Sequence, residues 1–359
     1  MDERQRKPGY GRRGILATAG AATAALATAG LAVVDIGRPA LGEGKLRAEP
    51  LIPPDRRGII LYSVRDRIQA APDNSGVPYG FERVLAHLAT IGYSEVEFAG
   101  YTQSTQILGR QITPAEIRKI LDDNGLVANG THTNISPGSL DAEMDIAQTL
   151  GMAHIGTGGD PSGSAYQADW DRAAQSWNEM GARATARGLK LYTHNHDAAY
   201  DFLLDAGPFD SSGRPTRSSG IRKLEYFMAR TDPKNVWFEM DILWAYLAQH
   251  RFRSYVDSAG RTRTDVFDPI LTVANRTRRF PLFHAKDGDH TANGYQEVPL
   301  GEGDINFQQF FQTIEQPDYH HANYEMDDAQ LGGSSDPGKS LRVAAQSYDN
   351  MSALTVYTR

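Results

Sequence analysis

Short apolar runs alternate along the chain with longer segments whose apolar residues recur at helical spacing. The run at 59–64 is followed by the segment at 81–91, in which Val84, Leu85 and Leu88 share one face of a helix. Thr113-Pro114-Ala115-Glu116 predicts the capped start of another helix. The alternation continues to the C-terminus and predicts a strand followed by a helix, repeated along the chain.

The pattern predicts eight strands. They are expected at 59–64, 94–98, 127–133, 154–158 and 190–196, with three more ending near Asp241, His284–Asp287 and Tyr324. Eight strand–helix units are the number that closes a (β/α)8 TIM barrel. The alternative is an open doubly wound sheet, which usually carries a glycine-rich loop after its first strand; this chain has Ser63-Val64-Arg65-Asp66 there. We therefore predict a single-domain α/β TIM barrel over residues 58–359.

Residues 1–34 are typical of a signal segment. Basic residues crowd the start of the chain, and an Ala-, Thr- and Gly-rich apolar run follows up to about residue 34. Arg12-Arg13, followed by Gly14-Ile15-Leu16, looks like a twin-arginine export signal. A membrane anchor is the alternative, although so many small residues make a poor membrane span. We expect extracytoplasmic export, a linker at residues 35–57, and membrane contact only through an uncleaved signal.

Composition and charge exclude several kinds of chemistry. The chain has no cysteine, which excludes disulfides, thiolate catalysis and zinc–sulfur sites. Its formal net charge is −7, and because residues 1–50 are net basic, the remainder is more acidic still. A protein that binds nucleic acid needs a basic surface for the phosphates. Nucleic-acid binding is therefore not expected.

Side chains that commonly bind metals stand at or near the ends of the last four predicted strands. They are His194, Asp241, His284 and Glu325. The C-terminal ends of barrel strands surround one mouth, where enzymes of this fold carry their active sites. Two imidazoles and two carboxylates suit a divalent metal such as Mn, Co, Zn, Mg or Fe. Each residue alone could simply close its strand with a hydrogen bond, but four on consecutive strands favour a metal site.

Two further residues share a strand face with these candidate ligands. His196 follows His194 by two positions, so it could replace His194 as a ligand, bind substrate, act in catalysis, or only support the ligands. Lys286 follows His284 by two positions and is expected in the same cavity, where it could stabilise an enolate or move a proton. We expect burial beside a metal to lower the pKa of Lys286. The alternative is a solvated lysine at the end of its strand.

Other strand ends supply candidates for catalysis and substrate contact. Glu97 ends the second strand and could act as a general base, bind hydroxyls, or pair with Arg65, which is itself among the expected substrate contacts. His132, on the third strand, is either a substrate contact or a core histidine. Tyr62 and Trp244 could form an apolar wall for a sugar ring, although such aromatic residues more often pack in the interior.

Five stretches, in order along the chain, resemble a known family. They are Leu61-Tyr62-Ser63-Val64-Arg65-Asp66, Ile91-Gly92-Tyr93-Ser94-Glu95-Val96-Glu97-Phe98-Ala99-Gly100, His194-Asn195-His196-Asp197, His284-Ala285-Lys286-Asp287 and Gly301-Glu302-Gly303-Asp304-Ile305. Together they resemble the sugar phosphate isomerase/epimerase family of xylose isomerase-like barrels, from about residue 58 onward. The resemblance implies a divalent metal at the barrel mouth and proton transfer next to a carbonyl. In many members of the wider superfamily the first ligand is a Glu on strand five, where this chain has His194.

From the residues and the resemblance together we expect a metal-dependent isomerase or epimerase acting on a sugar or keto-sugar. The alternatives are a dehydratase or lyase acting on inosose or a 3-keto-glycoside, a metal-dependent endonuclease of the same superfamily, and a secreted sugar-binding barrel without turnover. The endonuclease would need more ligands and a basic face, which the sequence does not show. Phosphorylated sugars are mostly intracellular, so the family name does not define the substrate of an exported protein. The expected partner is a sugar-like small molecule, and the sequence allows a homo-oligomer.

Overall fold

The computed structural model describes residues 47–100, 106–107, 110–314, 317–329 and 335–358. The expected signal segment at 1–34 and the first part of the expected linker lie outside these residues, so export stays a prediction. Within the described ranges, no helix combines the length and the apolar composition needed to cross a membrane.

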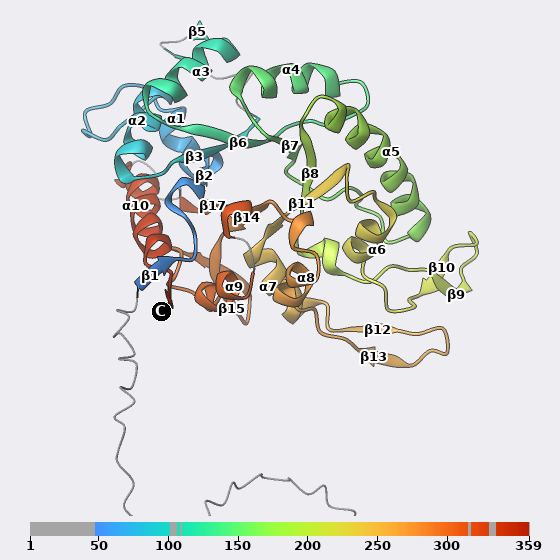
Figure 1. Ribbon diagram of the computed structural model, residues 1–359. Helices are drawn as coiled ribbons and strands as arrows, with labels where there is room; N and C mark the ends of the chain where they lie inside the picture. The colour runs from blue at the N-terminus through green and yellow to red at the C-terminus, as the bar shows by residue number, and fades with distance from the viewer. Residues whose placement is uncertain (1–46, 101–105, 108–109, 315–316, 330–334, 359) are drawn as a thin grey trace, which may run out of the picture. The chain divides into compact units, whose positions relative to one another are not determined.

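Eight parallel strands form a closed barrel (Figure 1). In order around the ring they are β2 (Arg57–Ile60), β3 (Glu95–Ala99), β6 (Val127–His132), β7 (His154–Thr157), β8 (Lys190–His194), β11 (Val236–Asp241), β14 (Leu282–Ala285) and β17 (His321–Tyr324). The last strand closes the ring by pairing with the first. The predicted (β/α)8 barrel is confirmed, and each strand lies within a few residues of its expected position.

Helices cover the outside of the barrel (Figure 1). They are α1 (Arg65–Ile68), α2 (Phe81–Ile91), α3 (Pro114–Asp123), α4 (Leu140–Leu150), α5 (Gln167–Ala186), α6 (Lys223–Arg230), α7 (Ile242–Arg251), α8 (Pro269–Ala274), α9 (Phe307–Thr313) and α10 (Lys339–Ser352). Single 3-10 turns are η1 (Pro54–Arg56), η2 (Leu61–Val64), η3 (Asp197–Tyr200), η4 (Thr277–Arg279) and η5 (Pro317–Tyr319). The apolar core lies between the helices and the outward faces of the strands, where Phe238 and Phe283 are fully buried.

The ends of two helices follow from local residue types. The predicted capping box begins α3: the Thr113 hydroxyl accepts the backbone N–H of Glu116, and the Glu116 carboxylate accepts the N–H of Thr113 at 2.8 Å. Helix α2 ends before Gly92, whose φ of 125° is one that residues with a Cβ rarely adopt.

Helix α7 was not expected from the sequence. It begins directly after Asp241 and is apolar on most sides, with Ile242, Leu243 and Leu247 fully buried or nearly so. Because it packs against both barrel strands and the hairpin that follows β14, it lacks the polar face that marks an amphipathic helix. The periodicity of apolar residues therefore did not reveal it.

Small antiparallel hairpins form separate two-stranded sheets outside the closed barrel. They pair β9 (Ala206–Phe209) with β10 (Pro215–Arg217), β12 (Ser254–Val256) with β13 (Thr262–Thr264), β15 (Asp287–Thr291) with β16 (Gly294–Val298), and β4 (Gln106–Ile107) with β5 (Arg110–Gln111). The first two extend away from the barrel (Figure 1).

The end of the expected linker belongs to the barrel unit. Strand β1 (Arg47–Pro50) pairs antiparallel with β18 (Thr355–Thr358), and Ile52 is buried against the core. The linker predicted at 35–57 is therefore too long at its C-terminal end. Residues 47–56 belong to the same compact unit as the barrel.

The inside of the barrel is polar. Buried side chains facing inward include Glu95, Glu97, Asn129, His154, Tyr192, Glu239 and Asn323, whereas TIM barrel interiors are usually filled by branched aliphatic residues. Glycines leave room for these large groups. A Cβ on Gly156 would lie 2.8 Å from the Tyr192 ring, which reaches across to contact Glu97 through its hydroxyl.

His154 in this polar interior makes the fold sensitive to acid. Its Nδ1 lies 2.8 Å from the carbonyl oxygen of Asn129, and its Nε2 is buried without a hydrogen-bond partner among the described residues. Burial, followed by the nearby His321, lowers the pKa of His154 to about 3. Below pH 6.5 the unfolded chain gains a proton at this residue while the folded chain stays neutral, so stability falls as the pH falls towards 3.

The variant His154→Gln tests this dependence. Between pH 7 and pH 5 the free energy of unfolding of the wild type should fall more than that of the variant. The difference should be about 2 kcal/mol, since one pH unit is worth about 1.4 kcal/mol per group. Urea unfolding at the two pH values measures it, and equal losses in both proteins would contradict the prediction.

Candidate metal centre

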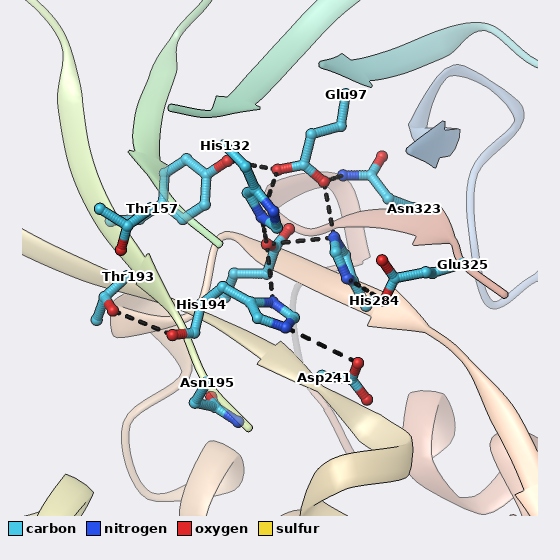
Figure 2. Close-up of polar contacts among 12 residues, drawn as sticks. Glu97, His132, Thr157, Thr193, His194, Asn195, Asp241, His284, Asn323 and Glu325 are labelled. Atoms are coloured by element: carbon cyan, nitrogen blue, oxygen red, sulfur yellow. Dashed lines mark hydrogen bonds and ion pairs between the residues drawn. The ribbon is translucent and has the colours of Figure 1, made fainter. Parts of the chain in front are cut away.

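The four predicted ligands meet at the C-terminal mouth of the barrel (Figure 2). His194 ends β8, Asp241 ends β11, His284 lies in β14, and Glu325 directly follows β17. One ligand atom from each lies within 4.8 Å of the others, and all four side chains are buried. The structure therefore brings together the residues that the sequence singled out. That they bind a metal stays a prediction.

Asp241 presents one oxygen to the centre of this group. Its Oδ1 accepts the backbone N–H of Trp244 at 2.9 Å and so caps helix α7. Its Oδ2 is buried without a hydrogen-bond partner among the described residues, 3.9 Å from Nε2 of His194 and 3.8 Å from Nζ of Lys286. A buried carboxylate oxygen without a partner is costly. A bound cation would satisfy it, so the residues present fit a metal.

The charges at the mouth also fit a cation. Six carboxylates lie at the mouth or directly behind it: Glu97, Glu239, Asp241, Glu297, Glu325 and Asp327. Among the described side chains ion-paired to them, Lys286 is the one permanent cation; the other partners are histidines. Buried negative charge in such excess is stabilised by a positive ion or by protonation.

The two proposed histidine ligands, His194 and His284, differ in protonation. Burial, together with the neighbouring His284 and His132, lowers the pKa of His194 well below its usual value, so its imidazole is neutral and can bind a metal. Burial acts in the same direction on His284, but the surrounding carboxylates outweigh it and raise its pKa well above the usual value. A metal that binds His284 must therefore displace a proton.

Two buried carboxylates stand behind the histidines. Glu239 Oε2 lies 2.7 Å from Nε2 of His132 and 3.2 Å from both Nδ1 of His194 and Nε2 of His284. Glu97 Oε2 lies 2.8 Å from the same His284 nitrogen. Glu239 was missed in the sequence, although it precedes Asp241 by two positions and so faces the same side of its strand.

Glu97 therefore lies behind the site and not in the cavity. It is fully buried and contacts Tyr192, His284 and Asn323. These contacts fit a residue that orients His284 better than one that binds hydroxyls or takes a proton from substrate. The alternative pairing with Arg65 is not found: Arg65 donates to the backbone oxygens of Tyr62 and Asp327.

Lys286 points into the mouth as predicted from its strand position, but its pKa shifts the other way. The side chain is 1% exposed, which rules out a solvated lysine. Burial alone would lower the pKa of Lys286, yet four carboxylates, led by Glu325 and Asp241, raise it well above the usual value. The ammonium is surrounded by negative charge, and the nearest of its partners is Asp327 at 2.5 Å. The lowering expected beside a bound metal stays a prediction.

A cavity of about 260 Å³ opens at the mouth. It is lined by Ile60, Tyr62, Ala99, His132, Gly158, His194, His196, Lys286, Glu325 and Asp327. The expected substrate contacts His132 and Tyr62 are part of this lining, as is His196. Trp244 stands behind His196, with ring centroids 5.5 Å apart, and Arg65 stacks on the Tyr62 ring at 3.5 Å. These two residues thus support the lining side chains.

The fold and this site define a TIM barrel with a buried histidine–carboxylate cluster at the mouth where enzymes of this fold act. Residues 85–346 match the family described as xylose isomerase-like TIM barrel, and the chain belongs to that family. A search of curated protein sequences finds no match.

Solved structures share the fold at low sequence identity. A sugar phosphate isomerase/epimerase from Parabacteroides distasonis is 20% identical with a TM-score of 0.61, over 83% of this chain and 94% of that one. A probable 3-DHS dehydratase, AsbF, from Bacillus anthracis is 13% identical with a TM-score of 0.55, over 82% and 97% of the two chains. The IolI protein with a bound zinc atom is 9% identical with a TM-score of 0.54, over 83% and 98%.

Proposed function

We propose that the protein is a divalent-metal-dependent enzyme that isomerises or epimerises a sugar or keto-sugar by proton transfer next to a carbonyl. The observation that carries the proposal is the convergence of four buried ligand atoms within 4.8 Å of one another, beside a cavity. The orphaned Oδ2 of Asp241 and the excess of carboxylates support a cation there. A zinc atom bound to a protein of the same fold is consistent with it.

The residues that line the cavity offer parts of this chemistry. When bound, a divalent cation would supply polarisation of a carbonyl and of the hydroxyl beside it. His196 lines the same cavity as the proposed ligands His194 and Glu325 and could accept a proton from the carbon between these groups. The Lys286 ammonium faces the same space and would stabilise the oxyanion that forms.

The size and lining of the cavity suit a small polar substrate. Its volume of about 260 Å³ lies just under the roughly 300–1,000 Å³ typical of pockets for drug-sized ligands. The lining combines imidazole, carboxylate and ammonium groups with the Tyr62 ring. The polar groups can bind the hydroxyls of a sugar, and the aromatic ring can pack against its apolar face. Elimination from a keto-sugar begins with the same proton transfer, so a dehydratase or lyase is the second candidate; AsbF shares the fold.

Metal analysis followed by solvent exchange tests this function. We expect about one divalent metal per chain in protein purified without chelators, and deuterium incorporation next to the carbonyl when keto-sugars and inosose are incubated in deuterated water. Product analysis then separates isomerisation from elimination. Chelator-treated protein is the control and should show no exchange. A metal-loaded protein that binds sugars without exchange would be a sugar-binding barrel, and a chain that takes up no metal would refute the proposal.

A further inference from the structure

We infer that two buried carboxylates set the tautomers of the two proposed histidine ligands, and so decide which nitrogen of each faces the metal. Glu239 holds a proton on Nδ1 of His194, and Glu97 holds one on Nε2 of His284. Nε2 of His194 and Nδ1 of His284 would then be the nitrogens that hold a metal. This inference rests on the proposed metal site and adds two positioning residues to it.

The contacts of His194 assign its proton. Its Nδ1 lies 3.2 Å from Glu239 Oε2, and among the described residues Glu239 is the one carboxylate within ion-pair distance of that nitrogen. Burial and the nearby Glu97 raise the pKa of Glu239 to about 7. Once Glu239 is ionised, its Oε2 only accepts, so Nδ1 donates and Nε2 keeps its lone pair. That lone pair faces Oδ2 of Asp241 across 3.9 Å, the space between two proposed ligands. The register supports this arrangement, since Glu239 sits directly beside His194 in the paired strands.

His284 is turned the other way round. Its Nε2 lies 2.8 Å from Glu97 Oε2 and 3.2 Å from Glu239 Oε2, while its Nδ1 lies 2.8 Å from Glu325 Oε2. With the Nε2 proton held by the two interior carboxylates, Nδ1 is the nitrogen that can lose its proton to a metal. A second carboxylate acceptor behind a metal-binding histidine fixes the ring and makes it a stronger ligand.

The same contacts distinguish this site from an alternative centre deeper in the barrel. His132, His194, Glu239 and His284 also converge, and a metal among them would need the Nδ1 of His194 and the Nε2 of His284. Here those two nitrogens face the interior carboxylates Glu239 and Glu97. The two arrangements use opposite nitrogens and are therefore distinguishable.

Zinc affinity of matched glutamine variants tests the inference. Glu239→Gln and Glu97→Gln keep the shape of the side chain and remove its charge. Glu95→Gln is the control, because Glu95 is an equally buried carboxylate of the barrel interior whose partners are His321, Asn129 and Arg56. Chelator competition should show zinc binding about 10- to 100-fold weaker in the first two variants and unchanged in the control. Thermal unfolding of the metal-free proteins shows whether each variant is folded.

Histidine-labelled wild-type protein gives a second measurement that needs no variant. Long-range proton–nitrogen spectra with bound Zn²⁺ should show a proton on Nδ1 of His194 and on Nε2 of His284. Opposite tautomers, or zinc affinity in Glu239→Gln equal to that of the wild type, would overturn the inference and leave the proposed function standing. A wild-type protein that binds no zinc or other divalent metal would overturn both.

Discussion

Replacing His284 by alanine is expected to abolish both metal binding and turnover. His284 is fully buried at the centre of the group, between Glu325 on one side and Glu97 with Glu239 on the other. Loss of a ligand should cost more than the roughly 10- to 100-fold in affinity that loss of a supporting residue costs. Metal per chain by emission spectroscopy and deuterium incorporation into a keto-sugar measure the two effects.

His290→Ala is the matched control for that variant. His290 is an exposed histidine of the β15–β16 hairpin that stacks on His250, outside the cavity lining. It should keep both its metal and its activity. Because His284→Ala also removes a buried partner of three carboxylates, circular dichroism must show that it is folded. A folded His284→Ala protein that still carries one metal per chain would place the metal elsewhere.

Replacing Lys286 by methionine is expected to lower turnover about a hundredfold or more while the metal stays bound, on the scale of a lost oxyanion donor. The ammonium lies 3.3 Å from Glu325 and 3.8 Å from Asp241, both proposed ligands, and it lines the cavity. Without the ammonium, less of the negative charge of these carboxylates is neutralised, so they attract a cation more strongly. Metal affinity should therefore be unchanged or higher, and single-turnover kinetics should show the loss in the chemical step.

A second buried lysine provides the comparison for this variant. Lys223, the first residue of helix α6, pairs with Asp201, and neither residue lines the cavity. Lys223→Met removes a partly buried ion pair of the same kind and is expected to lower stability without slowing the reaction. If Lys286→Met kept full turnover, Lys286 would have no role in the reaction and would only balance the charge of the neighbouring carboxylates. Loss of metal in that variant would make it a structural support of the site.

The periodicity of the sequence was sufficient to find the barrel and the end of the barrel that carries the site. Alternation of polar and apolar residues is a local property, and it placed His194, Asp241, His284 and Glu325 at successive strand ends, where the structure has them. The two-residue spacing also directed Lys286 into the mouth. Closure of eight strands then brings these ends together with no further information.

The tertiary structure alone decided what surrounds those residues. Glu97 on β3 meets His284 on β14, 187 positions away, and Glu239 meets three histidines from three strands. The pKa of Lys286 is raised because Glu297, from the hairpin after β14, and Asp327 join the two carboxylates already expected nearby. Contacts across a barrel depend on closure of the sheet and on side-chain length, and neither produces a periodic pattern in the sequence. The sequence by itself therefore determined the fold and the positions of the candidate ligands, whereas their protonation, their supporting carboxylates and the nitrogens they present depend on the packed interior.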